Sequence, residues 1–323
     1  MTLWFSLLAL LLAIVPVGGR ALAAEPVKIG ALNEGWGPTP ATAGLREGLK
    51  ALGYREGEQF VIGVRFTQGD SKSLPTAVRE LLQAGSDILF ASGTNPAKAA
   101  QAATTTVPIV FTEAISDPVL VGLVKSIAHP GGNITGVTDL QDELGPKRLE
   151  LFKEMLPGLK RIILVYDPDG ADQAEPILRR QRTAARQLGI TLVERPVRSE
   201  AEARSAIGTV RKGEDGLISG GGSMSFNIPG VVLDATTQHR IPTMFNAAFF
   251  PERGALASYG PDLTESGRQA ARLVDKIIKG QRPSTIPVEA NSRIEFVINL
   301  KVAKALGVSI APAALHRATR IIE

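Results

Sequence analysis

The chain has 323 residues, of which 44% are hydrophobic, 21% charged and 5% aromatic, and its formal net charge at pH 7 is +4. This composition is typical of a globular protein of about two domains, and the near balance of charges gives no support to nucleic-acid binding. The chain has no cysteine, which excludes disulfides, thiolate metal sites, a cysteine nucleophile and lipid attachment through a cysteine.

The first 24 residues have the pattern of an export signal. Residues 3–17 form an apolar run, and Ala21-Leu22-Ala23 supplies the small residues that signal peptidase recognises. The run is shorter than the roughly 18 residues of a membrane-spanning helix. One feature departs from the pattern, because Arg20 follows the apolar run and no basic residue precedes it. We expect residues 1–24 to be a signal peptide, with an uncleaved anchor as the alternative, and the mature protein to be soluble in the periplasm.

From residue 27 onward, apolar runs of strand length alternate with segments of helical periodicity. The first expected strands are 27–32, 60–66, 87–91, 108–111 and 134–138. The expected helices between them are 43–52, 74–82, an alanine-rich segment after 96, and 119–127. Strands alternating with helices at these spacings predict a parallel α/β sheet.

The second half of the chain repeats this plan. Its expected strands are 161–166, 190–197 and 215–219, and its expected helices are 146–156, 174–188 and 200–210. The joints also match, since Leu52-Gly53 corresponds to Leu188-Gly189, and GSDILFASG at 85–93 corresponds to GEDGLISGG at 213–221. We therefore expect two similar Rossmann-like lobes. The remaining expected elements are strands at 241–245, 255–259 and 295–298 and helices at 263–279, 302–306 and 312–323.

The motifs of several enzyme classes are missing. The chain has three histidines, and their spacing would not place two of them on one helix face to bind a metal ion. It also lacks both a GxSxG elbow and a phosphate-binding GxxxxGK[ST] loop. Four acids that follow strand ends could form the acid/base pair of a hydrolase. Loop acids are also common in binding sites, so we expect a binding protein with no catalytic residue, no metal and no cofactor.

Ligands of open parallel sheets lie beyond the carboxyl ends of the strands. Thr94 and Asn95 precede a helix there, and its free N–H groups would bind a carboxylate; the alternative is that one of them only caps the helix. Nearby acids suit an ammonium group, and aromatic rings could form apolar or cation–π walls. The expected ligand-binding residues are Asn33, Glu34, Trp36, Gly93, Thr94, Asn95, Glu113, Ser116, Asp117, Asp167, Ser223, Asn246, Phe249 and Tyr259.

Several longer motifs carry a family resemblance. These are GLREGLKALGYREGEQ at 44–59, SGTNPAKAAQAATTTVPIVF at 92–111, SDPVLVGLVKSIAHPGGNITGV at 116–137, KRLELFKEMLPGLKRI at 147–162 and FVINLKVAKALGVSI at 296–310. With these motifs the chain resembles the substrate-binding proteins of ABC transporters, of the type that includes a streptococcal tryptophan-binding protein. The resemblance runs from about residue 27 to the end of the chain.

The resemblance implies an α/β fold of the type I periplasmic-binding-protein class, in which two lobes with parallel sheets are joined by a multi-strand hinge. The implied lobes are 25–138 plus 257–281, and 139–256 plus 282–323, with the tail packed on the hinge or on either lobe. The implied function is closure on a small molecule and delivery to an ABC permease with its ATPase by a monomer. A sensing domain for a signalling partner and a periplasmic hydrolase are the alternatives.

The ligand itself stays open at this stage. Relatives usually have a Ser- or Pro-rich loop after the first strand, whereas this chain has Asn33-Glu34-Gly35-Trp36-Gly37. Asn95 stands where a proline is common, and glycines at 220–222 replace a bulkier loop. We expect an amino acid, with aromatic ones among the candidates; another small carboxylate or a nucleobase-like compound is the alternative.

Overall fold

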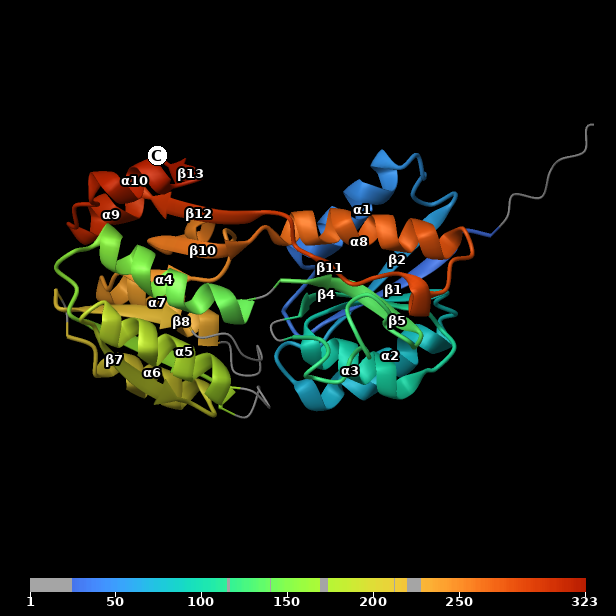
Figure 1. Cartoon of the computed structure of the whole chain (residues 1–323), viewed down its shortest axis with the longest axis horizontal. Helices are drawn as coiled ribbons and strands as arrows, with labels where there is room; N and C mark the ends of the chain where they lie inside the picture. The colour runs from blue at the N-terminus through green and yellow to red at the C-terminus, as the bar shows by residue number, and fades with distance from the viewer. Residues whose placement is uncertain (1–24, 115–116, 140, 169–173, 212, 220–227) are drawn as a thin grey trace, which may run out of the picture.

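The computed structural model describes residues 25–114, 117–139, 141–168, 174–211, 213–219 and 228–323, so the predicted signal peptide lies outside the described part. The chain folds into two α/β lobes that lie side by side (Figure 1). In the described residues, no helix is long and apolar enough to cross a membrane.

The first lobe contains a six-stranded parallel sheet with the order β11-β5-β4-β3-β1-β2. Its strands are β1 (Val27–Asn33), β2 (Phe60–Phe66), β3 (Ile88–Ser92), β4 (Ile109–Ala114), β5 (Ile134–Thr138) and β11 (Glu289–Ala290). The central strands β3 and β5 are buried along their whole length. They are continuous runs of small and apolar residues because helices cover both faces of the sheet.

Helices of the first lobe cover its two faces in pairs, with a short turn η1 (Ser71–Ser73) beside them. α1 (Pro40–Ala51) and α8 (Leu263–Ile278) pack on one face, where Leu45, Leu49 and Val274 contact the sheet. α2 (Leu74–Gln83) and α3 (Thr94–Ala103) pack on the other face. Figure 1 shows α8 lying along α1 although more than 200 residues separate them in sequence. The C-terminal third of the chain thus completes the first lobe.

The second lobe contains a seven-stranded sheet with the order β13-β12-β10-β9-β8-β6-β7, in which only the β10–β12 pair is antiparallel among the described strands. Its strands are β6 (Arg161–Tyr166), β7 (Thr191–Pro196), β8 (Asp215–Ser219), β9 (Thr243–Phe245), β10 (Ala257–Pro261), β12 (Ile294–Asn299) and β13 (Arg320–Ile322). Its helices are α4 (Gln141–Met155), α5 (Ala174–Gln187), α6 (Glu200–Gly208), α7 (Ile228–His239), α9 (Leu300–Leu306) and α10 (Pro312–Arg317). The order β7-β6-β8-β9-β10 repeats the order β2-β1-β3-β4-β5 of the first lobe, so the predicted repeat is confirmed.

The chain passes between the lobes three times. The first passage follows β5, the second lies between β10 and α8, and the third lies between β11 and β12. The second and third passages lie farther along the chain than the boundaries expected at 257 and 282. The reason is strand pairing, because β10 pairs with β12 in the second sheet and β11 pairs with β5 in the first. The short turns η2 (Pro251–Arg253) and η3 (Pro283–Thr285) precede these two passages.

The predicted helix at 119–127 is wrong, because the described residues of this segment form turns. Asp117 Oδ1 accepts a hydrogen bond from the N–H of Val119 at 2.8 Å, which stabilises a turn next to Pro118. Gly122 then takes a φ of +76°, which is incompatible with a continuing helix. Leu123 and Val124 instead belong to a loop, and both of their side chains are buried. At the end of the chain, the predicted helix stops at Arg317, and β13 follows it.

The contact between α1 and α8 depends on glycine. A Cβ atom on Gly44 would lie 2.0 Å from the carbonyl oxygen of Thr264, and one on Gly267 would lie 2.0 Å from the carbonyl oxygen of Ala41. Both neighbours are backbone atoms, which cannot move aside without shifting a helix.

We therefore expect Gly44→Ala to lower the free energy of unfolding by about 1–3 kcal/mol, because it overpacks this contact. Gly208→Ala is the matched control, since its Cβ would meet open space at the end of α6, and it should raise stability by up to about 1 kcal/mol. Urea denaturation measures both. An unchanged midpoint in Gly44→Ala would mean that the helices can separate without cost.

Candidate functional site

The carboxyl ends of the strands of the first lobe carry polar side chains at the edge that faces the second lobe (Figure 1). Asn33 ends β1, and its amide holds the following loop, accepting from the N–H of Gly35 at 2.7 Å and donating to the carbonyl of Gly37 at 3.1 Å. This loop places Glu34, which is buried. Ser71 donates a hydrogen bond to the Glu34 carboxylate, and Asn95 Nδ2 lies 3.4 Å from both of its oxygens.

Glu34 also connects the two lobes electrostatically. Burial is the main reason that its pKa lies above the ordinary value, hydrogen bonds from Ser71 and Asn95 lower it, and the negative charge of Asp167 raises it. Asp167 directly follows β6 of the second lobe and is buried as well. The negative charge of Asp167 in the second lobe thus contributes to the raised pKa of Glu34 in the first lobe.

Glu113 occupies a strained position at the end of β4. Its φ is +57°, and the pairing of β4 with β5 shifts register between Phe111 and Ala114. Such a conformation costs on the order of 1 kcal/mol or more for a residue with a side chain and is common at functional sites. Its Oε1 atom is buried without a hydrogen-bond partner. Burial, then the charge of Asp139, raises the pKa of Glu113 to about 8, and a hydrogen bond with Thr39 partly offsets this.

Asp139 lies where the three passages meet. Its Oδ1 accepts hydrogen bonds from Ser266 Oγ at 2.8 Å and from Asn291 Nδ2 at 3.3 Å. Asn291 also donates to the carbonyl of Asp262 at 3.0 Å through its side chain and to the carbonyl of Thr138 at 2.9 Å through its backbone. The other oxygen, Oδ2, is buried without a partner, and burial raises the pKa of Asp139 to about 6. We call Asp139, Ser266 and Asn291 the hinge node.

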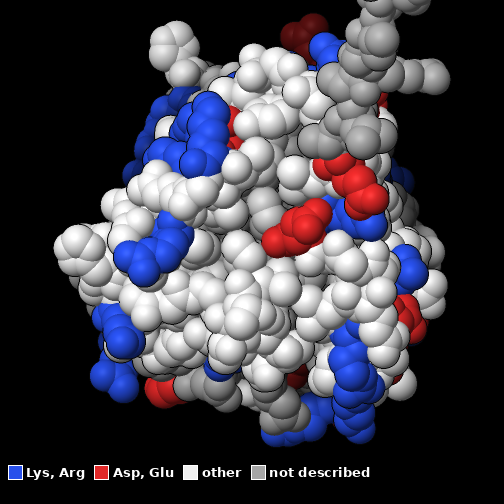
Figure 2. All heavy atoms as spheres, turned by 90° about the vertical axis from the view of Figure 1, so that its right-hand side faces the viewer, with Lys and Arg blue, Asp and Glu red and all other residues white. Residues whose placement is uncertain are grey.

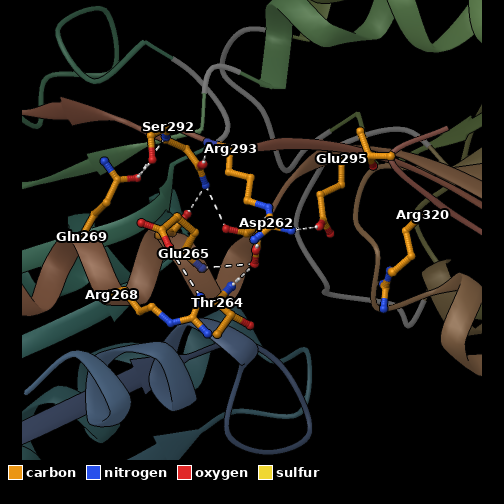
Figure 3. A network of polar contacts seen from close by, with 12 residues as sticks. Asp262, Thr264, Glu265, Arg268, Gln269, Ser292, Arg293, Glu295 and Arg320 are labelled. Atoms are coloured by element: carbon orange, nitrogen blue, oxygen red, sulfur yellow. Dashed lines mark hydrogen bonds and ion pairs between the residues drawn. The ribbon is translucent and has the colours of Figure 1, made fainter. Parts of the chain in front are cut away.

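A second set of contacts surrounds the hinge node (Figure 3). Asp262 caps α8 by accepting from the N–H groups of Thr264 at 2.9 Å and Glu265 at 3.1 Å. Arg293 lies between two acids, 3.7 Å from Asp262 and 3.0 Å from Glu295. These contacts tie the start of α8 to the segment that enters β12.

The start of α3 offers unsatisfied donors between the acids. Gly93 is its N-cap, with a φ of +112° and no side-chain cap bond, so the alternative that Thr94 or Asn95 caps the helix is wrong. The first N–H groups of a helix have no partner within it. Thr94 Oγ1 is also buried without a hydrogen-bond partner. The backbone of Thr94 and Asn95 is therefore suited to receive an anionic group.

The other predicted site residues have local contacts or lie outside the described part. Trp36 and Asp117 are exposed. Phe249 packs edge-on against Phe250, with the guanidinium of Arg253 3.4 Å from its ring centre. Tyr259 packs edge-on against Phe296, and the Asn246 carbonyl lies so close to Gly260 that a Cβ there would be 1.7 Å away. Ser116 and Ser223 lie outside the described residues.

The structure thus brings Asn33, Glu34, Gly93, Thr94, Asn95 and Glu113 to one edge of the first lobe, with Asp167 opposite. Sequence reasoning missed Ser71, the hinge node and Arg148. Arg148 is buried on α4, donates to the carbonyl of Tyr259 at 2.8 Å and has an unpartnered Nη2. The position of Asp139 directly after a predicted strand was the available signal for one of these. No group of metal-ligating side chains that could hold an ion occurs within the described ranges.

The raised pKa values predict how stability depends on pH. Between its ordinary pKa of 4.5 and the folded-state pKa of about 8, Glu113 holds a proton in the folded protein that it loses on unfolding. Stability must therefore fall as pH rises through this window, by on the order of a few kcal/mol. Glu113→Gln cannot ionise, so its free energy of unfolding should fall less than that of the wild type between pH 5 and 8.

The matched control is Glu58→Gln, because Glu58 is an exposed partner of Arg55. Its denaturation curves should follow the wild-type pH profile. Parallel profiles for Glu113→Gln and the wild type would show that Glu113 ionises normally in the folded protein.

Comparisons with known proteins assign the chain to a family. The sequence model of the family described as ABC transporter substrate binding protein matches residues 27–322. A "Tyrosine-binding protein" of Clostridioides difficile (strain R20291) is 28% identical over 82% of this chain and 76% of its own length. The crystal structure of a conserved domain protein from Vibrio cholerae has a TM-score of 0.80 at 32% identity, covering 92% of this chain and 100% of that one.

A further solved structure contains a ligand. It is an ABC domain from Streptococcus pneumoniae in complex with L-Trp, with a TM-score of 0.80, 27% identity, and coverage of 92% of this chain and 100% of that one. The two-lobed architecture is the type I periplasmic-binding-protein fold, as the resemblance implied. The chain belongs to the family of ABC transporter substrate-binding proteins.

Proposed function

We propose that this protein is the periplasmic solute-binding component of an ABC transporter, that its two lobes close on an amino acid, and that it delivers this ligand to a membrane permease without chemical turnover. The observation that carries the proposal is the set of buried polar atoms without a partner at the strand ends of the first lobe, which are Thr94 Oγ1, Glu113 Oε1 and Asp139 Oδ2. A ligand that binds these atoms and also reaches the second lobe contacts both lobes, and this contact is what favours a closed state over an open one.

The polar groups of the first lobe suit the two charges of an amino acid. The free N–H groups at the start of α3 suit its carboxylate, because they combine hydrogen-bond donors with the positive end of the helix dipole. Glu113 and Asp139, with one unpartnered oxygen each, suit its ammonium group. The named ligands of two relatives, tyrosine and L-Trp, support the same class of ligand.

The family, described as ABC transporter substrate binding protein, supports delivery to a permease. The hinge node supports the closing motion, because a few residues at three passages are the usual site of rotation in such domain movements. The predicted export signal supports a periplasmic location.

A thermal-shift screen tests the proposal directly. The panel contains the twenty common amino acids, small organic acids and nucleosides, each at millimolar concentration. We expect at least one amino acid to raise the melting temperature, since a ligand at 100 times its Kd adds about 2.7 kcal/mol to stability. A folded protein that none of the amino acids stabilises would contradict the proposal.

Two substitutions at one position locate the carboxylate. Thr94 is the first residue of α3, a position where proline is tolerated because its missing N–H has no helical partner. Thr94→Pro removes an N–H that would bind the ligand, so affinity should fall at least tenfold, the loss expected for a hydrogen bond to a charged group. Thr94→Val keeps this N–H and should lose less affinity for the ligand than Thr94→Pro.

A further inference from the structure

Glu113 and Asp139 are buried acids without a basic partner. On the surface of the first lobe, for example, Glu56 is paired with Arg46, and Figure 2 shows blue and red side chains interspersed over the outer end of this lobe. By contrast, no Lys, Arg or His in the described ranges contributes to the pKa of Glu113 or of Asp139. Proteins normally pair a buried acid or keep it protonated. The charge of these two acids must therefore be offset by a proton or by a cation from outside the chain.

A bulge in β4 brings Glu113 to the same face of the sheet as Asp139. Between Phe111 and Ala114, β4 has one residue more than the paired segment of β5, and an extra residue reverses the face to which side chains point. Glu113 holds this position with its φ of +57°. It is hydrogen-bonded to Thr39 at the start of α1, and Asp139 is bonded to α8, which packs along α1. Because neighbouring strands are about 4.8 Å apart, one small cationic group can contact both acids.

The other charged groups on the elements around the two acids have contacts of their own. The start of α8 and the neighbouring strands carry ion pairs, which are Glu265–Arg268 at 3.4 Å, Asp262–Arg293 at 3.7 Å and Glu289–Arg272 at 3.2 Å. Beyond β3, Glu34 accepts hydrogen bonds from Ser71 and Asn95. Neither Lys98 of α3 nor Arg148 of α4 contributes to the pKa of either acid. In the described part of these elements, no side chain thus supplies the positive charge.

A row of hydroxyl groups adjoins Glu113. Thr39 Oγ1 lies 3.3 Å from Ser92 Oγ, which lies 3.5 Å from Thr112 Oγ1, and in both contacts either atom can be the donor. A hydroxyl group both donates and accepts hydrogen bonds. Thr39 can therefore accept a hydrogen bond from a protonated Glu113 and donate one to an ionised Glu113, so its surroundings accommodate both states.

Individual atoms show that the pair is incomplete. Glu113 Oε1 and Asp139 Oδ2 are both buried without a hydrogen-bond partner, and Asp139 is only 1% exposed. Burial raises the pKa of Asp139 to about 6, and burial together with the charge of Asp139 raises the pKa of Glu113 to about 8. At pH 7, between these two values, the pair holds one proton.

Resting on the proposed function, we propose that Glu113 and Asp139 hold one proton in the empty protein and that the ammonium group of the ligand replaces it. The O–H bond of the Glu113 carboxyl group breaks, its proton passes to solvent, and the carboxylate binds the ammonium group, which keeps its own protons. The total charge of the buried region is the same before and after the exchange.

The exchange makes ligand affinity depend on pH. The empty protein holds one proton more than the complex, so removing protons from solution favours the complex. Affinity therefore rises with pH, by up to about tenfold per pH unit, and levels off above the pKa of Glu113 in the empty protein, about 8. Below this pH, the ligand competes with a proton for the same place.

Isothermal titration calorimetry counts the released protons. The probe is the amino acid that raises the melting temperature most in the thermal-shift screen, titrated at pH 7 in phosphate, imidazole and Tris buffers, whose enthalpies of ionisation differ. We expect the dependence of the observed heat on the buffer to correspond to roughly one proton released per ligand bound. The dissociation constant should also fall roughly tenfold from pH 6 to pH 7.

A variant assigns the proton to its residue. Glu113→Gln has no carboxyl proton to release, so its proton release should fall close to zero and its affinity should change little between pH 6 and pH 7. Glu58→Gln is the matched control, because Glu58 is an exposed partner of Arg55, and it should release as many protons as the wild type. Equal proton release by Glu113→Gln and the wild type would overturn the assignment to Glu113.

The outcomes separate the inference from the proposed function. If an amino acid binds the wild type without proton release, the exchange is wrong and the amino-acid-binding function stands. If no amino acid binds, the proposed function is contradicted and the exchange with it. The wild-type buffer series decides these cases even if Glu113→Gln fails to fold, which circular dichroism and melting curves would reveal.

Discussion

The buried carboxylate of Asp139 holds together the three segments that join the lobes. Its hydrogen bonds reach Ser266 and Asn291, which lie 127 and 152 residues farther along the chain. Each lobe has separate hydrophobic clusters on the two faces of its own sheet. The relative position of the lobes therefore depends on a few polar contacts at the passages. A rotation of one lobe needs changes only there, while both sheets stay intact.

Asp139 also lies beside the proposed ligand site at the strand ends of the first lobe, so it links the hinge to the site. Asp139 contributes to the raised pKa of Glu113, so a cation that binds Glu113 also changes the electrostatic environment of the hinge node. Without such a cation, the pKa of each acid stays above its ordinary value. In the proposed function, a cationic group of the ligand compensates charge on the first lobe while another part of the ligand contacts the second lobe. This difference in contact between the open and closed states would favour closure.

The two-lobed fold could be predicted from the sequence because the patterns that indicate it lie within short stretches of the chain. Apolar runs and glycine joints recur with the same spacing in both halves, and the strand orders around β1 and β6 are the same. The passages were harder to place, since they depend on which sheet β10 and β11 join, and a sequence does not display strand pairing. The helix predicted at 119–127 failed because apolar spacing alone does not register Pro118 or the left-handed Gly122.

The candidate site also contains residues that could be predicted from the sequence and residues that could not. Glu34, Glu113 and Asp167 were predicted because each follows a strand, and the carboxyl ends of parallel strands meet at one edge. The hinge node escaped prediction because its members come from three distant segments. The aromatic candidates Phe249 and Tyr259 contact other rings and an arginine within the second lobe, whereas a sequence pattern cannot distinguish a ligand wall from such packing.

The distance between the lobes, measured with and without ligand, tests the central claim most directly. Because the chain has no cysteine, Lys72→Cys in η1 of the first lobe and Glu200→Cys at the start of α6 in the second lobe can carry one spin label each. Double electron–electron resonance then reports the interlobe distance in the empty protein and with a saturating concentration of the amino acid that stabilises the protein most in the thermal-shift screen. We predict a shift to shorter distances with this ligand. An unchanged distance distribution at a concentration at which the ligand is bound would contradict closure.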